Sequence, residues 1–241
     1  MIRIGVLTPH AAVGPEAEFA AMAPGRLVTR VVRIQDERVS GDPATAAALV
    51  ALTDPVLLDR GADELLAEPI ELIAYASTTT GYVIGADAEQ AIVTRLARRT
   101  GLPVVATGSA AIAALRTLQV QRLALIGAPW FAPEYNDLGA DYFASQGVEV
   151  VGSTSAELAL DPDAIEADAV TDWVASHVSD AAEAVFIGGN GFRTVEAIDP
   201  LERALGRPML TANQVLLWQL LAVAHAPLVI TGYGRAFGYA R

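Results

Sequence analysis

Short runs of β-branched and aliphatic residues alternate with longer stretches rich in Ala, Leu, Glu and Arg along the whole chain. Apolar runs of this length predict buried strands, and the longer stretches predict helices. The predicted strands are 2–7, 27–34, 72–76, 104–106, 122–126, 148–151, 184–187 and 209–210. The predicted helices are 43–67, 86–99, 109–118, 134–146, 161–178, 194–205 and 213–225. This alternation is typical of an α/β fold with mostly parallel sheets flanked by helices.

The order of the turns predicts an internal duplication. Three pairs of turns correspond in sequence order: 8–10 with 127–130, 76–81 with 188–191, and 107–109 with 211–214. We therefore expect two pseudo-symmetric Rossmann-like halves, an N-terminal half over 1–118 that is completed by 212–241, and a C-terminal half over 119–211. Because ligands of open α/β sheets bind at the carboxyl ends of the strands, we expect the site in the cleft between the halves.

Composition excludes several classes of chemistry. The 241 residues are 53% hydrophobic and 18% charged, which is typical of a globular protein with a large core. All 16 basic residues are Arg, and the absence of Lys excludes a Schiff base and a P-loop lysine. The absence of Cys excludes thiolate nucleophiles, disulfides and cysteine zinc sites, and three separated His residues make a metal site improbable. We expect neither a metal nor a cofactor.

The formal net charge of −12 argues against nucleic acid or an anionic membrane as a partner, since both require a basic face. No stretch of about 20 apolar residues is present, as a membrane-spanning helix requires, and the first apolar run is too short for a signal peptide. A cytoplasmic location is the expectation.

Two turns are candidates for anion binding. Four consecutive hydroxyl residues, Ser77 to Thr80, follow an apolar strand, where a strand-to-helix turn presents backbone N–H groups to a carboxylate. In the second turn, Gly188, Gly189, Asn190 and Gly191 allow a ligand to approach the backbone, and Arg193 could bind a carboxylate. The simpler alternatives are a helix N-cap for the first turn and, for the second, a glycine-rich turn whose Arg193 pairs with an acidic side chain such as Glu196.

Other candidate residues flank these turns. His10 ends the first predicted strand, and it is either a general acid or base or a polar loop residue that only forms hydrogen bonds. His177 and His225 fall near helix ends and are interpreted as surface or capping residues. Trp130 is expected either to line the pocket or to pack in the core. Asn213 is interpreted either as a helix cap alone or as a cap that also faces the cleft.

These turns, in this order, resemble the aspartate/glutamate racemase superfamily, and within it the branch of maleate cis-trans isomerases and arylmalonate decarboxylases. The resemblance spans nearly the whole chain and is most specific at 73–79 and at 186–194 followed by Ala197 and Ile198, with a moderate match at 5–9, Glu16 and Glu18. It implies that Thr78 and Thr79 of one turn, and Asn190 and Gly191 of the other, hold a substrate carboxylate and stabilise an enediolate.

The chain also departs from the pattern of that branch. Ser77 and Gly189 occupy the positions of the two catalytic cysteines, Ala12 occupies the position of the isomerases' loop asparagine, and Trp130 replaces a substrate-binding tyrosine. A covalent cysteine adduct is therefore impossible. Serine is a poor acid or base unless a neighbour activates it, and His10 is the candidate for that role.

The resulting hypothesis is a cofactor-independent isomerase or lyase that acts at the carbon next to a carboxylate of a small acid, with Ser77 and His10 as catalytic residues. The expected substrate-binding residues are Thr78, Thr79, Gly189, Asn190, Gly191, Arg193, Trp130 and Asn213. Decarboxylation or elimination needs one proton donor and fits the missing thiols better than two-base racemisation. The alternative is an inactive protein that binds or senses a small carboxylate. Homo-oligomerisation is expected from the resemblance alone.

Overall fold

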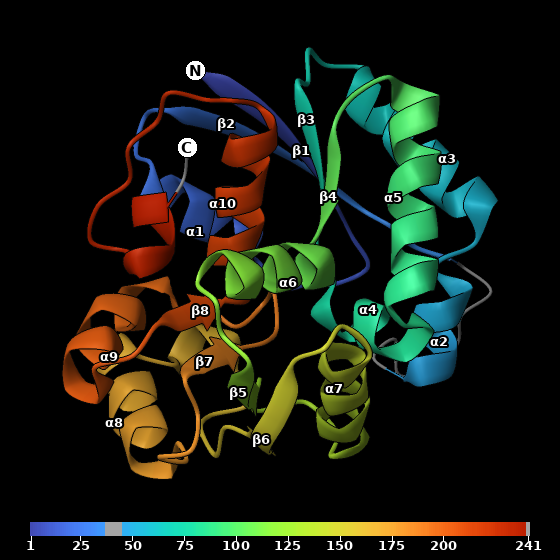
Figure 1. The fold of residues 1–241 in the computed structure, drawn as a ribbon. Helices are drawn as coiled ribbons and strands as arrows, with labels where there is room; N and C mark the ends of the chain where they lie inside the picture. The colour runs from blue at the N-terminus through green and yellow to red at the C-terminus, as the bar shows by residue number, and fades with distance from the viewer. Residues whose placement is uncertain (37–44, 240–241) are drawn as a thin grey trace.

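The computed structural model describes residues 1–36 and 45–239. Its eight described strands form two four-stranded parallel sheets with equivalent strand orders, β2-β1-β3-β4 and β6-β5-β7-β8 (Figure 1). The first sheet contains β1 (Ile2–Thr8), β2 (Leu27–Arg33), β3 (Leu72–Tyr75) and β4 (Val104–Ala106). The second contains β5 (Arg122–Gly127), β6 (Glu149–Ser155), β7 (Ala184–Ile187) and β8 (Met209–Thr211). The predicted α/β fold with two pseudo-symmetric halves is confirmed.

Helices flank both sheets. The helices are α1 (Pro15–Met22), α2 (Ala46–Ala51), α3 (Pro55–Leu66), α4 (Thr78–Ile84), α5 (Ala86–Thr100), α6 (Thr107–Thr117), α7 (Glu134–Ser145), α8 (Ala167–His177), α9 (Ile198–Leu205) and α10 (Ala212–Val223). Short 3₁₀ turns occur at Pro162–Ala164, Val195–Ala197 and Arg235–Tyr239. Among the described residues, none of these helices combines the length and apolarity needed to cross a bilayer.

The predicted helix 43–67 is wrong as a single element. The structure has α2 and α3 there, separated at Asp54, whose carboxylate accepts the N–H groups of Val56 and Leu57 while Pro55 begins α3. This is a standard N-terminal cap, and it restarts the helix. The helix start predicted at Asp42-Pro43 lies outside the described residues.

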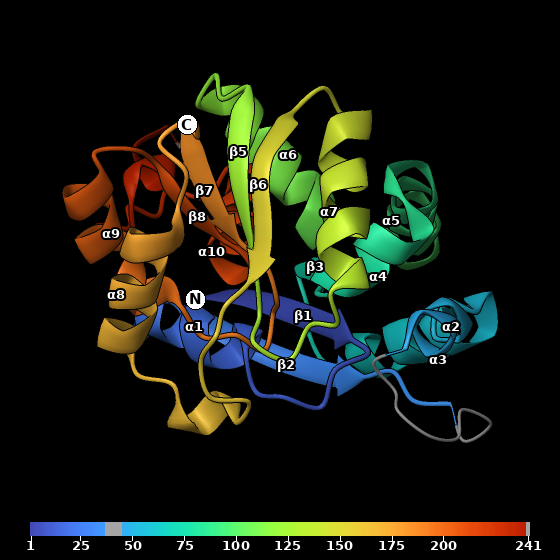
Figure 2. The same ribbon diagram turned by 90° about the horizontal axis from the view of Figure 1, so that it is seen from below.

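Helix α10 joins the two halves. It packs on α6 and α1 and contacts β3 and β4 of the first sheet as well as β8 of the second. Figure 1 shows α6 and α10 in the middle of the molecule, and Figure 2 shows that the strands of the two sheets run in different directions. The carboxyl ends of the central strands β1, β3, β5 and β7 thereby lead their turns toward the boundary between the halves.

The first loop lies directly against the turn that follows β7. A Cβ placed on Gly14 would lie 1.7 Å from the backbone oxygen of Asn190, and one on Gly191 would lie 2.8 Å from the Cβ of Ala12. Only glycine permits so close an approach of two backbones. Two turns that are about 175 residues apart in sequence are therefore in direct backbone contact.

Candidate functional site

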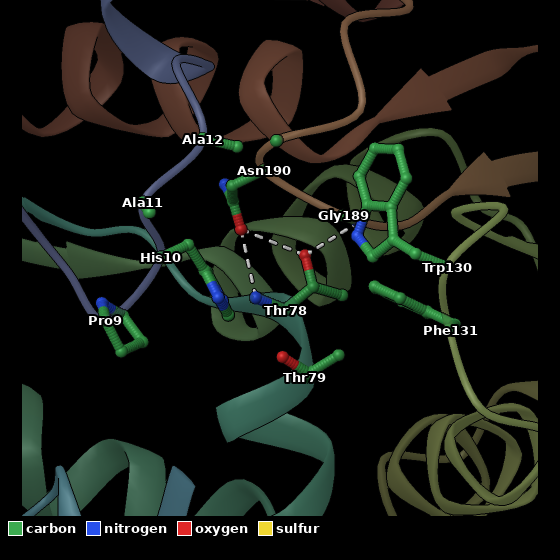
Figure 3. A pocket seen from close by; sticks show the side chains of 11 residues that line it. Pro9, His10, Ala11, Ala12, Thr78, Thr79, Trp130, Phe131, Gly189 and Asn190 are labelled. Atoms are coloured by element: carbon green, nitrogen blue, oxygen red, sulfur yellow. Dashed lines mark hydrogen bonds between the residues drawn. The ribbon is translucent and has the colours of Figure 1, made fainter. Parts of the chain in front are cut away.

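A small cavity lies where these turns meet. Its lining comes from both halves: residues 9–12, Thr78, Thr79, Trp130, Phe131 and 189–191 (Figure 3). The volume of about 190 Å³ is below the roughly 300 Å³ at which sites for drug-sized ligands begin, so the cavity suits a small molecule. Of the described residues in the lining, His10 is the one with a titratable side chain.

Ser77 and His10 form a hydrogen-bonded pair at the cavity. His10 Nε2 lies 2.9 Å from Ser77 Oγ. Ser77 caps α4, accepting the N–H of Thr80 at 3.2 Å, and its hydroxyl also bonds that of Thr80 at 2.6 Å. Ser77 is fully buried, while His10 is half-buried and lines the cavity. His10 is thus the member of the pair that a ligand can touch.

Burial lowers the pKa of His10 to about 4 because the imidazolium loses its hydration. The imidazole is therefore neutral at pH 7. A neutral imidazole has one N–H donor and one acceptor nitrogen, so Nε2 of His10 can either donate a hydrogen bond to Ser77 Oγ or accept one from it.

Asn190 links the two candidate turns. Its Oδ1 accepts both the N–H and the hydroxyl of Thr78, at 2.9 and 3.0 Å (Figure 3). Thr78 Oγ1 in turn accepts the N–H of Gly189 at 3.1 Å. Asn190 Nδ2 donates to Thr107 Oγ1 and to Asn213 Oδ1, at 3.1 and 2.9 Å. The amide of Asn190 is therefore fully used in joining the halves, and it holds Thr78 in place.

The hydrogen-bond donors that remain free for an anion are backbone N–H groups next to Thr78 and Asn190 in the two turns. Within 1–36 and 45–239, no protein atom accepts the backbone N–H of Thr79, Asn190 or Gly191. All three residues line the cavity, and they come from both turns. Unpaired N–H groups at a ligand cavity are suited to a carboxylate or an oxyanion.

The structure separates two predicted residues from this cavity. Arg193 donates to the carbonyl of Pro162 at 3.2 Å and forms an ion pair with Asp163, and it lines a second cavity of about 320 Å³. Arg193 thus pairs with an acidic side chain, as the simpler interpretation expects, but the partner is Asp163 and not Glu196. Asn213 is completely buried behind Asn190 and does not line the first cavity.

The aromatic residues after β5 take different positions. Trp130 and Phe131 line the cavity, and Trp130 also packs edge-on against Phe192 with ring centroids 5.8 Å apart. Tyr135 is buried in α7 next to Phe131, with ring centroids 5.9 Å apart.

Glu18 is the residue that sequence reasoning missed. It is 3% exposed, and its carboxylate accepts the N–H groups of Thr194 and Val195 and the Nδ2 of Asn213. Burial raises the pKa of Glu18 to about 7, and the three hydrogen bonds and Arg193 oppose that rise. Its one sequence signal is its place in the N-terminal motif. The described residues contain no group of three His, Asp or Glu side chains arranged to hold a metal ion.

Comparisons with known proteins agree with this architecture. The chain is 27% identical over 233 residues to a maleate isomerase of Geobacillus stearothermophilus, covering 91% of this chain and 90% of that protein. It is 25% identical over 175 residues to an arylmalonate decarboxylase of Bordetella bronchiseptica, covering 69% and 70% of the two chains. The solved structure of a maleate isomerase from Pseudomonas putida S16, a cysteine-to-alanine variant with maleate, has the same fold, with a TM-score of 0.85, 22% identity and 99% and 98% coverage.

A family model supplies the assignment. The model described as arylmalonate decarboxylase matches residues 52–237, more than three quarters of the chain. The match includes the turns that contain Ser77 and Asn190 and the helix that begins at Ala212. With the fold and both turns in agreement, the chain belongs to the arylmalonate decarboxylase family.

Proposed function

We propose that this protein is a cofactor-independent lyase or isomerase that acts at the carbon next to a carboxylate of a small acid. The observation that supports it best is the His10–Ser77 pair beside a cavity that also has free N–H donors from two turns. The names of the relatives, arylmalonate decarboxylase and maleate isomerase, point to the same class of substrate.

The free N–H groups of Thr79 and Gly191 are proposed to hold the carboxylate. Breaking a bond at the α-carbon leaves an electron pair that moves into this carboxylate and forms an enediolate. Fixed N–H donors stabilise that added charge more strongly in a small protein cavity than in bulk water. Thr78 and Asn190 are assigned a supporting role, since their own polar groups are paired with each other.

The single proton-transfer pair favours decarboxylation. In this reaction the carbon–carbon bond to one carboxylate breaks, CO₂ leaves, and the electron pair enters the remaining carboxylate. The α-carbon then takes one proton from the His10–Ser77 pair, and water returns a proton to the pair. Isomerisation or racemisation would need a second group that moves protons, and the described part of the chain places no other titratable side chain in the cavity lining.

The shape and charge of the cavity limit the substrate. Among residues 1–36 and 45–239, no Arg lies in its lining, and Ala11, Ala12, Trp130 and Phe131 provide apolar surface. We expect a small acid with one apolar substituent on its α-carbon, such as a substituted malonate, and not an acid that needs an arginine at each end.

The second candidate function is a carboxylate-binding protein without turnover. The two positions without cysteine, Ser77 and Gly189, favour it. Binding with no chemistry on any related acid would support this alternative.

Proton NMR in D₂O with a panel of small acids tests the proposal. We expect a substituted malonate to lose CO₂ and gain one deuterium at its α-carbon. Maleate, aspartate and glutamate test isomerisation and racemisation in the same experiment. Line broadening without conversion of any acid would contradict the proposed activity and support the binding function.

A further inference from the structure

Glu18 reaches from α1 to the turn that contains Asn190. One carboxylate oxygen accepts the N–H groups of Thr194 and Val195, the latter at 2.8 Å, and the other accepts Asn213 Nδ2 at 2.7 Å. Three donors on one carboxylate is the pattern expected for an ionised acid, which only accepts hydrogen bonds. The first helix thereby fixes a turn of the opposite half.

The hydrogen bonds from Glu18 continue in one direction to the cavity. Since the carboxylate is an acceptor, Asn213 must present its Nδ2 to Glu18, and the same nitrogen donates to the backbone oxygen of Asn190 at 2.9 Å. Asn213 Oδ1 is left to accept Asn190 Nδ2. Asn190 Oδ1 is then left for the N–H and hydroxyl of Thr78. Each amide orientation follows from the one before it.

We propose that Glu18 is a positioning residue: through Asn213, its carboxylate fixes the side-chain orientation of Asn190 and hence of Thr78 at the cavity. Glu18 does not line this cavity, so it acts through its neighbours. The inference rests on the proposed function only for its effect on turnover, because the orientation of the amides is a property of the protein itself.

Protonation of Glu18 would oppose this arrangement. A protonated Glu18 that donates toward Asn213 would face the Nδ2 hydrogens of Asn213, which are also donors. Rotating the Asn213 amide would relieve this clash, but it would place Asn213 Oδ1 against the backbone oxygen of Asn190. Asn190 would then lose its acceptor or turn its own N–H groups toward the N–H of Thr78. The orientation of Thr78 is therefore expected to depend on the charge of Glu18.

The second cavity gives Glu18 a route to solvent and a charged surrounding. Glu18 forms part of its lining. Among the described residues, the other charged groups that face this cavity are Arg193, Asp163, Glu166 and Glu196, and Tyr233 is a further titratable group influenced by Glu18. Of these, Arg193 favours the ionised form of Glu18. With the pKa of Glu18 raised to about 7 by burial, its charge changes near neutral pH.

Asparagine-selective labelling makes the proposal directly testable. The chain contains three asparagines, Asn136, Asn190 and Asn213. In protein labelled with ¹⁵N only at asparagine, we expect the side-chain NH₂ signals of Asn190 and Asn213 to shift together between pH 5 and 9, with one common midpoint. Asn136, which donates to Ser155 Oγ at 3.1 Å, is the internal reference that should not follow this midpoint.

Matched variants assign the midpoint to Glu18. In E18Q we expect the shared transition of Asn190 and Asn213 to disappear. In E202Q, which alters another carboxylate that accepts backbone N–H groups but lies outside this network, we expect it to remain. If E18Q fails to fold, the wild-type titration and the N213A variant still test the proposal. In N213A, the pH response of the Asn190 side-chain signals should disappear.

Activity provides a separate result. If a substrate is found, the pH profile of kcat/KM should lose a neutral-pH limb in E18Q and keep it in E202Q. If none is found, the NMR titration still tests the positioning role. Fixed Asn190 signals from pH 5 to 9, or a transition that reaches Asn213 but not Asn190, would overturn the proposal.

Discussion

At the scale of single residues, two buried carboxylates organise the molecule. Glu18 accepts N–H groups at the start of the 3₁₀ turn before α9, and Glu89 accepts those of Gly108 and Ser109 at the start of α6 and the hydroxyl of Tyr142. Burial raises the pKa of both carboxyls. Each therefore exchanges hydration for specific contacts across the fold.

The raised pKa of Glu18 predicts a pH-dependent stability. The folded protein keeps a proton on Glu18 up to about pH 7, whereas the unfolded chain releases it near pH 4.5. The free energy of unfolding therefore falls as the pH rises from 4.5 through 7, by on the order of 3 kcal/mol. In E18Q this contribution is absent, so its stability relative to wild type should be higher at pH 8 than at pH 5. Urea denaturation at both pH values measures the difference, and parallel values would contradict the prediction.

The His10–Ser77 pair predicts non-additive losses of activity. Because both residues belong to one hydrogen-bonded unit, H10A and S77A should each reduce kcat/KM by about 10²–10⁴-fold, and the double variant should lose little more than either one. Steady-state kinetics on the substrate identified by NMR provide the measurement. S145A is a control, since Ser145 is exposed and its hydroxyl bonds only the carbonyl of Tyr142 and the side chain of Gln146 among the described residues. Multiplicative losses would show that the two residues act independently.

At the scale of elements, most boundaries could be predicted from the sequence because the apolar runs are short and well separated. The two missed helices lack a helical pattern. In α4, Thr78 to Gly81 offers β-branched residues and a glycine, and the helix forms because Ser77 caps it and Asn190 holds its first residue. In α1, the helical stretch is only eight residues long, and tertiary contacts of Glu18 and Phe19 stabilise it.

The site was predictable to a similar extent. The two turns and His10 follow strand ends, so topology alone brings them together. The local sequence does not indicate which residues Arg193 and Glu18 contact. The partner of Arg193, Asp163, lies in a turn 30 residues away, and the backbone partners of Glu18 are about 175 residues away. Such pairings depend on how the two halves dock.

Gly14 tests the contact between the first loop and the turn after β7. G14A places a Cβ against the backbone oxygen of Asn190, so the loop or the turn must move. We expect a loss of about 1–3 kcal/mol in stability and weaker ligand binding. Thermal denaturation and titration with a small carboxylate measure these effects. G152A, where a Cβ meets no atom within 4 Å, is the control and should retain both properties; equal behaviour of the two variants would refute the close contact.

At the scale of the whole molecule, α10 contacts strands of both sheets. We propose that residues 1–118 are completed by 212–241, with 119–211 as the other half. The packing of α10 on α1 and α6 supports this division. Its apolar residues Leu216, Leu217 and Leu220 are completely buried.

Leu217→Ala should therefore disturb the first half. We expect the cavity it leaves to cost about 2–5 kcal/mol. Hydrogen exchange should show greater loss of protection in α1 and α6 than in α8. Leu160→Ala, at a residue that is 69% exposed, should change neither stability nor exchange. Loss of protection confined to the second half would contradict the proposed division.

The central position of α10 also constrains how the protein is made. Residues 1–118 leave the ribosome before α10 is synthesised, so the surfaces of α1 and α6 that pack on α10 stay uncovered until residues 212–223 have emerged. Premature release or a stalled ribosome before residue 212 would leave this surface exposed and would leave Asn190, which lines the cavity, without its partner Asn213. Ordering of the site thus waits for the synthesis of α10, so a chain that stops before residue 212 does not present a finished binding cavity.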